Sequence, residues 1–322
     1  MDNIVETKNL KTYFKVAAGT LHAVDDVTLA IPRGSTLGVV GESGCGKSTL
    51  GRTILGLTPS VSGSVLFEGR EITNLSKRES WKLRMRMQMI FQDPYSSLDP
   101  RMSITQIIEE PLKIYGVCKS KAEREKLVSE LMDTVGIARR FANSYPHELD
   151  GGRRQRIGIA RALALNPDFI VCDEPVSALD VSIQAQVLNL LQDLQQERKL
   201  TYMFITHDLS VVRHISDHIC VMYLGRVVES CEAKELFRNP VHPYTKALLS
   251  AIPIPSAHLT EEPIPLRGEV TSPIDPPACC RFAARCEYAA ERCFREEPQP
   301  TPCGEGHFCA CFLTEERART GE

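Results

Sequence analysis

Apolar residues come in short runs over the first 40 positions of the chain, where glycines and a proline separate them. This pattern predicts β-structure over 3–40, with 36–40 as a short buried strand. Residues 120–136 instead carry apolar side chains at the three- and four-residue spacing of one helix face. The members of that face are Leu127, Leu131, Met132 and Val135. We therefore expect a helical subdomain over about 93–165.

Strands and helices alternate in the second half of the chain. Apolar strands are predicted at 169–172 and 202–205, with a helix at 185–198 between them. This alternation implies an α/β fold with a mainly parallel, doubly wound sheet. From residue 239 closely spaced prolines disfavour long regular elements.

The change of texture near residue 240 sets the predicted domain boundaries. We expect a main domain over 1–240, a linker or C-terminal extension over 241–264, and a small cysteine-rich module over 265–322. The 322 residues are 43% hydrophobic, which is enough for a buried core, and the formal net charge is −3. That charge argues against a dedicated nucleic-acid binder.

The composition also indicates a compartment. The chain lacks an apolar run of about 20 residues, the length that a membrane helix needs, and its first residues do not resemble a signal peptide. We therefore expect a cytosolic location. Seven of the twelve cysteines crowd into the last 45 or so residues, and in a reducing compartment such crowding favours metal binding over disulfides.

The strongest motif is GxxxxGK[ST] at 41–48, which follows the strand at 36–40 and precedes a helical stretch at 49–57. Glycines let successive N–H groups point at phosphates, Lys47 adds a positive charge, and the Ser48 hydroxyl can ligate Mg²⁺. The motif predicts ATP binding. The residues expected to contact the nucleotide are Gly41, Ser43, Gly44, Cys45, Gly46, Lys47, Ser48 and Thr49.

Three strand ends carry polar side chains suited to phosphoanhydride hydrolysis. Asp173 can bind Mg²⁺ and Glu174 can accept a proton from an attacking water. His207 can hydrogen-bond the γ-phosphate, and Gln92 can reach Mg²⁺ or the water. Surface acids and a capped core histidine are the alternatives, which the strand-end positions disfavour.

Taken in order, these motifs resemble those of an ATP-binding-cassette (ABC) ATPase subunit over about 3–250. The resemblance implies a P-loop NTPase fold with an N-terminal β-subdomain and the inserted helical subdomain. It also implies that Tyr13 stacks on adenine, and that Glu174, His207 and Gln92 serve catalysis. Further nucleotide contacts are implied for the signature and D-loop residues Asp150, Gly151, Gly152 and Asp180.

The segments 91–101 and 239–245 and the proline-rich tail are similar to the dipeptide/oligopeptide permease family, in particular its F-type ATPase subunit. The resemblance implies an ATP-hydrolysing motor that drives peptide uptake from the cytoplasmic face of the inner membrane. Nickel and glutathione importers share these features. An exporter motor is a weaker alternative, as is a soluble ABC factor acting on ribosomes or DNA, because this chain has one cassette and an unsuitable charge balance.

The same resemblance implies partners. Two cassettes pair head to tail, so that each ATP lies between the Walker A loop of one and the signature of the other. Two membrane permease subunits and a peptide-binding protein complete such a complex. The groove for a membrane-subunit helix is expected near 92–101.

The signature departs from the family pattern, with Asp150 in place of serine and Arg153 in place of glutamine. An aspartate facing the γ-phosphate would be unfavourable, which leads to the hypothesis of a heterodimer with unequal sites. The alternative is that Asp150 turns away and caps the signature helix.

The tail cysteines lack the CxxC spacing of a zinc ribbon. The resemblance implies instead a [4Fe–4S] cluster, with structural zinc and then disulfides as alternatives. The implied ligands are Cys280, Cys286, Cys293 and Cys311, which leaves Cys279, Cys303 and Cys309 as extra cysteines.

Overall fold

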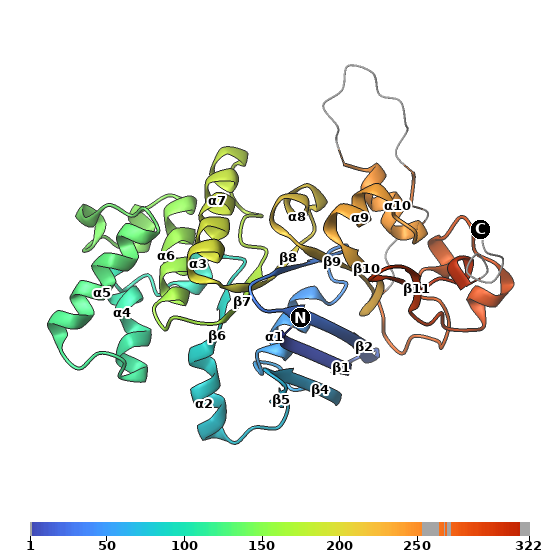
Figure 1. Ribbon diagram of the computed structural model, residues 1–322, viewed down its shortest axis with the longest axis horizontal. Helices are drawn as coiled ribbons and strands as arrows, with labels where there is room; N and C mark the ends of the chain where they lie inside the picture. The colour runs from blue at the N-terminus through green and yellow to red at the C-terminus, as the bar shows by residue number, and fades with distance from the viewer. Residues whose placement is uncertain (1, 253–263, 267, 269–271, 316–322) are drawn as a thin grey trace, which may run out of the picture. The chain divides into compact units, whose positions relative to one another are not determined.

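The computed structural model describes residues 2–252, 264–266, 268 and 272–315 (Figure 1). Residues 253–263 of the predicted linker, residues 267 and 269–271 of the predicted module, and its end beyond residue 315 lie outside the described residues. The chain divides into two compact units. The first contains residues 2–4, 32–34 and 74–205, and the second contains the remaining described residues.

The first unit contains three parallel strands in the order β8-β7-β6. They are β6 (Met87–Ile90), β7 (Phe169–Asp173) and β8 (Thr201–Thr206). Every residue of β7 and β8 is buried. Continuous burial of this kind is typical of parallel strands that are covered on both faces.

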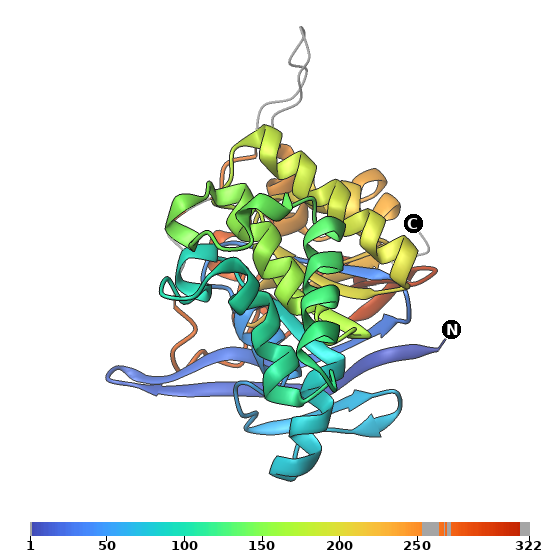
Figure 2. The same cartoon turned by 90° about the vertical axis from the view of Figure 1, so that its left-hand side faces the viewer.

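Helices make up the rest of the first unit. They are α2 (Lys77–Arg86), α3 (Pro94–Ser97), α4 (Ile104–Tyr115), α5 (Lys121–Thr134), α6 (Gly151–Leu163) and α7 (Val181–Arg198), with 3-10 turns η1 (Arg139–Phe141) and η2 (Pro146–Glu148). Figure 2 shows α4, α5 and α6 side by side as the green helices nearest the viewer. Side chains of Ser103, Ser120 and Asp150 cap the first turns of these three helices, which satisfies N–H groups that lack partners within the helix.

The second unit contains an antiparallel sheet in the order β2-β1-β4-β5. Its strands are β1 (Asn3–Val16), β2 (Gly19–Pro32), β4 (Ser62–Phe67) and β5 (Arg70–Glu71). The apolar residues Val5, Leu10 and Val27 are fully buried on these strands. The strands β1 and β2 lie within the β-structure predicted over 3–40, whereas β4 and β5 lie outside that range.

A second set of strands in this unit has the order β11-β12-β10-β9-β3. They are β3 (Thr36–Val40), β9 (His218–Tyr223), β10 (Arg226–Glu232), β11 (Thr301–Gly304) and β12 (His307–Cys309). Only β3 and β9 are parallel to each other, and the remaining pairs are antiparallel. The sequence prediction of a mainly parallel sheet missed these antiparallel strands, two of which come from the cysteine-rich tail.

The helices of the second unit are α1 (Lys47–Ile54), α8 (Leu209–Ile215), α9 (Ala233–Arg238) and α10 (Pro243–Ser250), with 3-10 turns η3 (Ala283–Arg285) and η4 (Glu291–Phe294). The helix α10 forms despite the surrounding prolines because Pro243 occupies its first position, where proline is tolerated. Its Tyr244 packs with Tyr223 and with Phe282 of the tail. The tail therefore contributes to the core of this unit.

Individual elements follow the sequence prediction closely. The strand predicted at 36–40 is β3, the helix predicted at 120–136 contains α5, and the helix predicted at 185–198 forms the greater part of α7. Residues 94–163 contain only helices and connecting segments. None of the helices in the described part of the chain is long and apolar enough to cross a membrane.

Candidate nucleotide-binding site

The glycine-rich segment 41–48 forms a tight loop between β3 and α1 in the second unit. Gly46 lies immediately before the helix and has φ of 105°. A Cβ atom at this position would approach the Ala23 carbonyl oxygen to 1.9 Å, so the backbone leaves space only for glycine. The loop therefore leads directly into the N-terminus of α1, where the helix dipole favours an anion.

Lys47 folds back onto this loop. Its Nζ donates hydrogen bonds to the carbonyl oxygens of Gly41 at 2.7 Å and Glu42 at 2.9 Å, and the residue is 4% exposed. The ammonium group is thus held at the centre of the loop by backbone oxygens. A bound triphosphate would offer it stronger, charged acceptors.

Tyr13 is part of a polar cluster on the β1–β2 hairpin. Its ring stacks on His22 with centroids 3.9 Å apart, and its hydroxyl donates to Asp25. Burial raises the pKa of Asp25, but hydrogen bonds from Tyr13 and His22 and the charges of Arg226 and Arg281 outweigh it and lower this pKa to about 2. Asp25 is therefore a fixed negative charge beside Tyr13.

His207 also belongs to the second unit and follows β8 directly. It is exposed. The next residue, Asp208, caps α8 by accepting a hydrogen bond from the Ser210 N–H at 2.8 Å. The backbone around His207 is thereby fixed by a local cap.

Gln92 and Glu174 meet in the first unit. The Gln92 side-chain amide donates to the Glu174 carboxylate at 2.8 Å, and Asp173 is buried at the end of β7. Glu174 has φ of 44°, a left-handed conformation that is uncommon for a residue with a side chain. Its N–H donates to the Ile205 carbonyl at 2.9 Å. Strained backbone of this kind is often found where a side chain must be aimed precisely.

The signature segment starts helix α6 in the same unit. Asp150 accepts a hydrogen bond from the Arg153 N–H at 2.8 Å and forms an ion pair with the Arg153 guanidinium at 2.9 Å. The structure thus shows Asp150 as the cap of the signature helix, which is the alternative left open by the sequence. A Cβ at Gly152 would lie 2.4 Å from Ile183 Cγ2, so close packing on α7 requires glycine there.

The D-loop residue Asp180 is exposed and occupies the position before α7 without a side-chain capping bond. Gln184 instead fixes this loop by donating to the carbonyl oxygens of Val176 and Leu179, both at 3.0 Å. Leu179 also lies against Gly151, where a Cβ would approach it to 3.2 Å. The signature and the D-loop are therefore packed together within the first unit.

The tail cysteines divide into two groups. One group lines a common pocket of about 50 Å³ together with Phe282 and Phe312. Its members are Cys280, Cys286, Cys293 and Cys311. These are the four residues that the family resemblance selects, and Cys279, Cys303 and Cys309 are not part of the lining.

The thiols of this pocket are not arranged around a single ion. Within the described residues, no group of three or more histidine, cysteine or acidic side chains could hold a metal ion. All twelve cysteines are described and each has a free thiol. Burial raises the pKa of Cys280 to about 12.

Sequence reasoning missed the residues that hold the phosphate loop from outside. The Arg285 guanidinium contacts the Glu42 carboxylate with two hydrogen bonds, at 2.6 and 3.0 Å, and the Glu42 N–H donates to the Tyr244 hydroxyl at 2.9 Å. More than 200 positions separate each pair along the chain. No local pattern could have indicated them.

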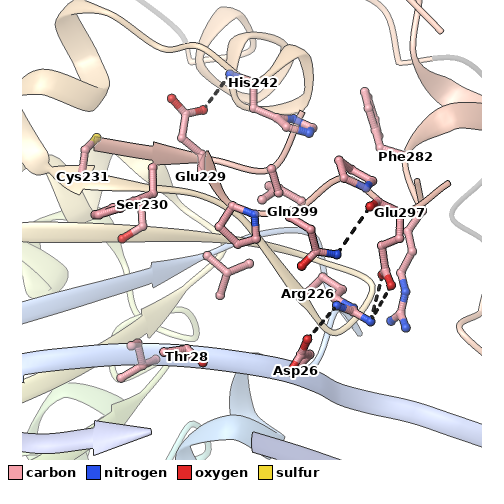
Figure 3. A pocket seen from close by; sticks show the side chains of 18 of the residues that line it. Asp26, Thr28, Arg226, Glu229, Ser230, Cys231, His242, Phe282, Glu297 and Gln299 are labelled. Carbon is pink, nitrogen blue, oxygen red and sulfur yellow. Dashed lines mark hydrogen bonds and ion pairs between the residues drawn. The ribbon is translucent and has the colours of Figure 1, made fainter. Parts of the chain in front are cut away.

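A cavity of about 580 Å³ lies elsewhere in the second unit, between β2, β10 and the tail (Figure 3). Arg226 is at its wall, where its guanidinium pairs with Glu297 at 2.9 Å and Asp26 at 3.5 Å. Glu229, also at the wall, accepts the His242 N–H at 2.9 Å. The charged groups at this wall are therefore paired with one another, and Glu297 of the tail is one of the partners.

Known families match both parts of the chain. The ABC transporter model matches residues 24–177, and the model of the oligopeptide/dipeptide transporter C-terminal region matches residues 228–293. The oligopeptide transport ATP-binding protein AppF of Bacillus subtilis is 49% identical over 322 residues, which covers 97% of this chain and 98% of that protein. The chain belongs to the ABC transporter family.

Other relatives agree with this assignment. The oligopeptide transport ATP-binding protein OppF of Bacillus subtilis is 56% identical over 255 residues, covering 79% of this chain and 84% of that protein. A dimeric ATP-binding cassette, MJ0796 with ADP and Pi, is 32% identical with a TM-score of 0.66, covering 71% of this chain and 98% of that one. CbiO1 from Clostridium perfringens has the same TM-score at 29% identity, with 74% and 92% covered. These structures confirm the predicted ABC cassette fold.

Proposed function

We propose that this chain is the ATP-hydrolysing subunit of an ABC importer of dipeptides or oligopeptides. The observation that carries the proposal is the match of the whole chain to peptide-transport ATP-binding proteins, which extends through the C-terminal region at 228–293. The formed phosphate loop and the Gln92–Glu174 pair supply the hydrolytic groups. A nickel or glutathione importer would share the mechanism and differ only in cargo.

The residues of each unit have separate tasks in this proposal. Lys47 and the N–H groups of the loop bind the phosphates of ATP, and Tyr13 stacks on adenine. Ser48, Asp173 and Gln92 hold Mg²⁺, which neutralises charge on the phosphates. The buried carboxylate of Asp173 and the amide of Gln92 are oxygen donors of the kind that Mg²⁺ prefers.

Glu174 accepts the proton of the attacking water in this mechanism, and His207 donates a hydrogen bond to the γ-phosphate. The Gln92 amide already donates to the Glu174 carboxylate at 2.8 Å. That contact holds the carboxylate in one orientation, which a proton acceptor for the attacking water needs. Gln92 also connects Glu174 to the segment 92–101, which we propose to contact the membrane subunits.

The proposed partners follow from the pairing of cassettes, and the dimeric solved cassette supports such pairing. We propose that the second cassette is a different chain. Gly151, Gly152 and the segment of Asp180 contact the ATP that this second cassette binds. Two permease subunits dock near 92–101 and place this chain at the cytoplasmic face of the inner membrane. A peptide-binding protein delivers the cargo on the other side.

The tail holds a [4Fe–4S] cluster in this proposal. Four cysteines that line one pocket are the number that such a cluster requires. A tetrahedral zinc ion would need sulfur atoms within about 3.8 Å of one another, and the described residues contain no group that could hold a single ion. The ligands of a cluster bind separate iron atoms, so a cluster does not require the four thiols to surround a single ion. When bound, the cluster would staple a tail that has few regular elements of its own.

ATP hydrolysis by the assembled complex tests the transport proposal. The chain is purified with its membrane partners, and turnover is measured with an empty and a loaded binding protein. Stimulation by a dipeptide or oligopeptide is the expected result. Stimulation by nickel or glutathione alone would overturn the peptide cargo, and the absence of co-purifying membrane subunits would favour a soluble ABC factor.

Iron and sulfide analysis after anaerobic purification tests the cluster. We expect about four iron and four sulfide per chain. Cys280→Ser should lose them, whereas Cys303→Ser should keep them because Cys303 lies outside the pocket. One zinc per chain, or no metal, would overturn the cluster.

A further inference from the structure

Two arginines of the tail reach the nucleotide side of the second unit. Arg281 follows Cys280 in the sequence, and Arg285 precedes Cys286, so each is the direct neighbour of a cysteine that lines the tail pocket. The side chains of both arginines are only 8% exposed. Burial of a charged guanidinium is costly unless specific partners compensate it.

Arg285 has its partner in the phosphate loop. Its Nη1 and Nη2 atoms donate to the two carboxylate oxygens of Glu42, at 2.6 and 3.0 Å. This two-point contact fixes the direction as well as the position of the carboxylate. Glu42 is the second residue of the loop, and its carbonyl oxygen accepts from Lys47 Nζ at 2.9 Å. Arg285 is therefore connected through a single residue, Glu42, to the lysine that binds phosphate.

The backbone of Glu42 is held from the same side. Its N–H donates to the Tyr244 hydroxyl at 2.9 Å. Tyr244 is fully buried, and its ring packs against Phe282 with centroids 5.4 Å apart. Phe282 lies between the two arginines in the sequence. The side chain and the backbone of Glu42 thus both depend on how the tail is packed.

Arg281 has its partner on the adenine side. Its Nη2 donates to the carboxylate of Asp25, the same group that accepts from the Tyr13 hydroxyl. Arg226 also contacts Asp25, at 3.4 Å, and is in turn paired with Glu297 of the tail at 2.9 Å (Figure 3). The tail therefore also reaches the residue that holds Tyr13.

We propose that the cysteine-bearing tail is a structural part of this chain's own ATP site, with Arg285 as a positioning residue for the phosphate loop and Arg281 as a positioning residue for Tyr13. Arg285 acts through Glu42 in two ways. It neutralises a carboxylate that would otherwise repel the triphosphate, and it fixes the turn whose carbonyl oxygens hold Lys47. Both effects act on ATP affinity before hydrolysis takes place.

The affinity of the full-length chain for MgATP, measured by equilibrium binding, tests this proposal. Arg285→Ala should raise the Kd about tenfold, equivalent to about 1.4 kcal/mol. Adding Glu42→Gln to that variant should bring the Kd back to within about threefold of the unsubstituted chain, because the uncompensated charge is then gone. The turnover number at saturating ATP in the assembled complex should change less than twofold. A purely stabilising role predicts a lower melting temperature with an unchanged Kd.

Arg295→Ala is the matched control. Arg295 also belongs to the tail, but its ion pair with Glu291 is exposed, with 72% and 79% of the two side chains accessible to solvent. Its Kd should equal that of the unsubstituted chain. The alkylation rate of the tail thiols reports whether each variant keeps the tail packed. If Arg285→Ala exposes the thiols, Arg285→Lys is tested in its place. Lysine keeps the positive charge but loses the two-point hydrogen bonding of the guanidinium, so the Kd should rise about threefold.

A Kd for the Arg285 variant equal to that of Arg295→Ala, with the thiols protected, would overturn the proposal. So would a double variant with Glu42→Gln that binds ATP no better than the Arg285 variant alone. Failure of the unsubstituted chain to bind MgATP would instead contradict its assignment as an ATPase.

Discussion

The phosphate loop and the signature segment are both glycine-containing turns at the start of a helix, yet they are held in different ways. The signature is fixed by neighbours in sequence, since Asp150 caps its helix through Arg153 three positions later. The loop at 41–48 is fixed by Tyr244 and Arg285, which lie about 200 or more positions away. The comparison teaches that two motifs of equal clarity in a sequence can differ in how far along the chain their hydrogen-bond partners lie.

Removing the charge at the centre of the loop should give the largest effect. Lys47→Ala deletes an ammonium that now bonds to two loop carbonyls and would bond to phosphate. Hydrogen bonds to charged groups contribute up to about 3 kcal/mol, so the affinity for ATP should fall about a hundredfold. Equilibrium binding of MgATP checks this. No variant in the signature should weaken ATP binding by this chain as much as Lys47→Ala does. A signature variant with an equally large loss of ATP affinity would contradict the comparison.

A methyl group in the signature should affect stability instead of nucleotide affinity. Gly152→Ala would place a Cβ only 2.4 Å from Ile183 Cγ2. Overpacking of this kind costs about 1–3 kcal/mol. Urea unfolding should show the loss, while the Kd for MgATP should equal that of the unsubstituted chain. Gly158→Ala is the control, because a Cβ there would meet no atom within 4 Å.

The difference between the two regions also explains what could be predicted. The glycines, Lys47 and the strand-end pair Asp173 and Glu174 follow from fixed local spacings, and the structure places them on the expected elements. The cap at Asp150 could be foreseen as an alternative because capping is a local interaction. The partners of Glu42 could not be foreseen, since an arginine among many in a proline-rich tail has no spacing that assigns it to a distant carboxylate.

Strong acid should weaken the long-range contacts that Asp25 makes with Arg226 and Arg281. Asp25 has a pKa of about 2 in the folded chain, below its ordinary value of 3.8, so the folded state favours the charged form. The stabilisation is complete above pH 4 and is lost as the pH falls from about 4 to about 2, by about 1.4 kcal/mol for each pKa unit before solvent screening. The free energy of unfolding, measured against pH, should show a smaller acid loss in Asp25→Asn. Equal slopes would contradict this role of Asp25.

The smallest effect should come from the signature cap. Asp150→Ala removes the bond from the Arg153 N–H and should cost about 1 kcal/mol of stability, whereas Asp150→Ser keeps a capping oxygen and should be nearly neutral. Thermal unfolding of the two variants separates these expectations. If Asp150 instead faces the partner's ATP, Asp150→Ser should raise the ATPase activity of the complex. That outcome would show that the cap is not its only role.

The central claim is that ATP hydrolysis by this chain drives peptide import, and labelled-peptide uptake tests it most directly. The complex is reconstituted in vesicles with MgATP on the side of this chain and the loaded peptide-binding protein on the other. The account predicts uptake that requires ATP and falls by about 10² or more in Glu174→Gln, the variant that lacks the proton acceptor. ATP-independent uptake, or uptake by Glu174→Gln at the unsubstituted rate, would contradict it.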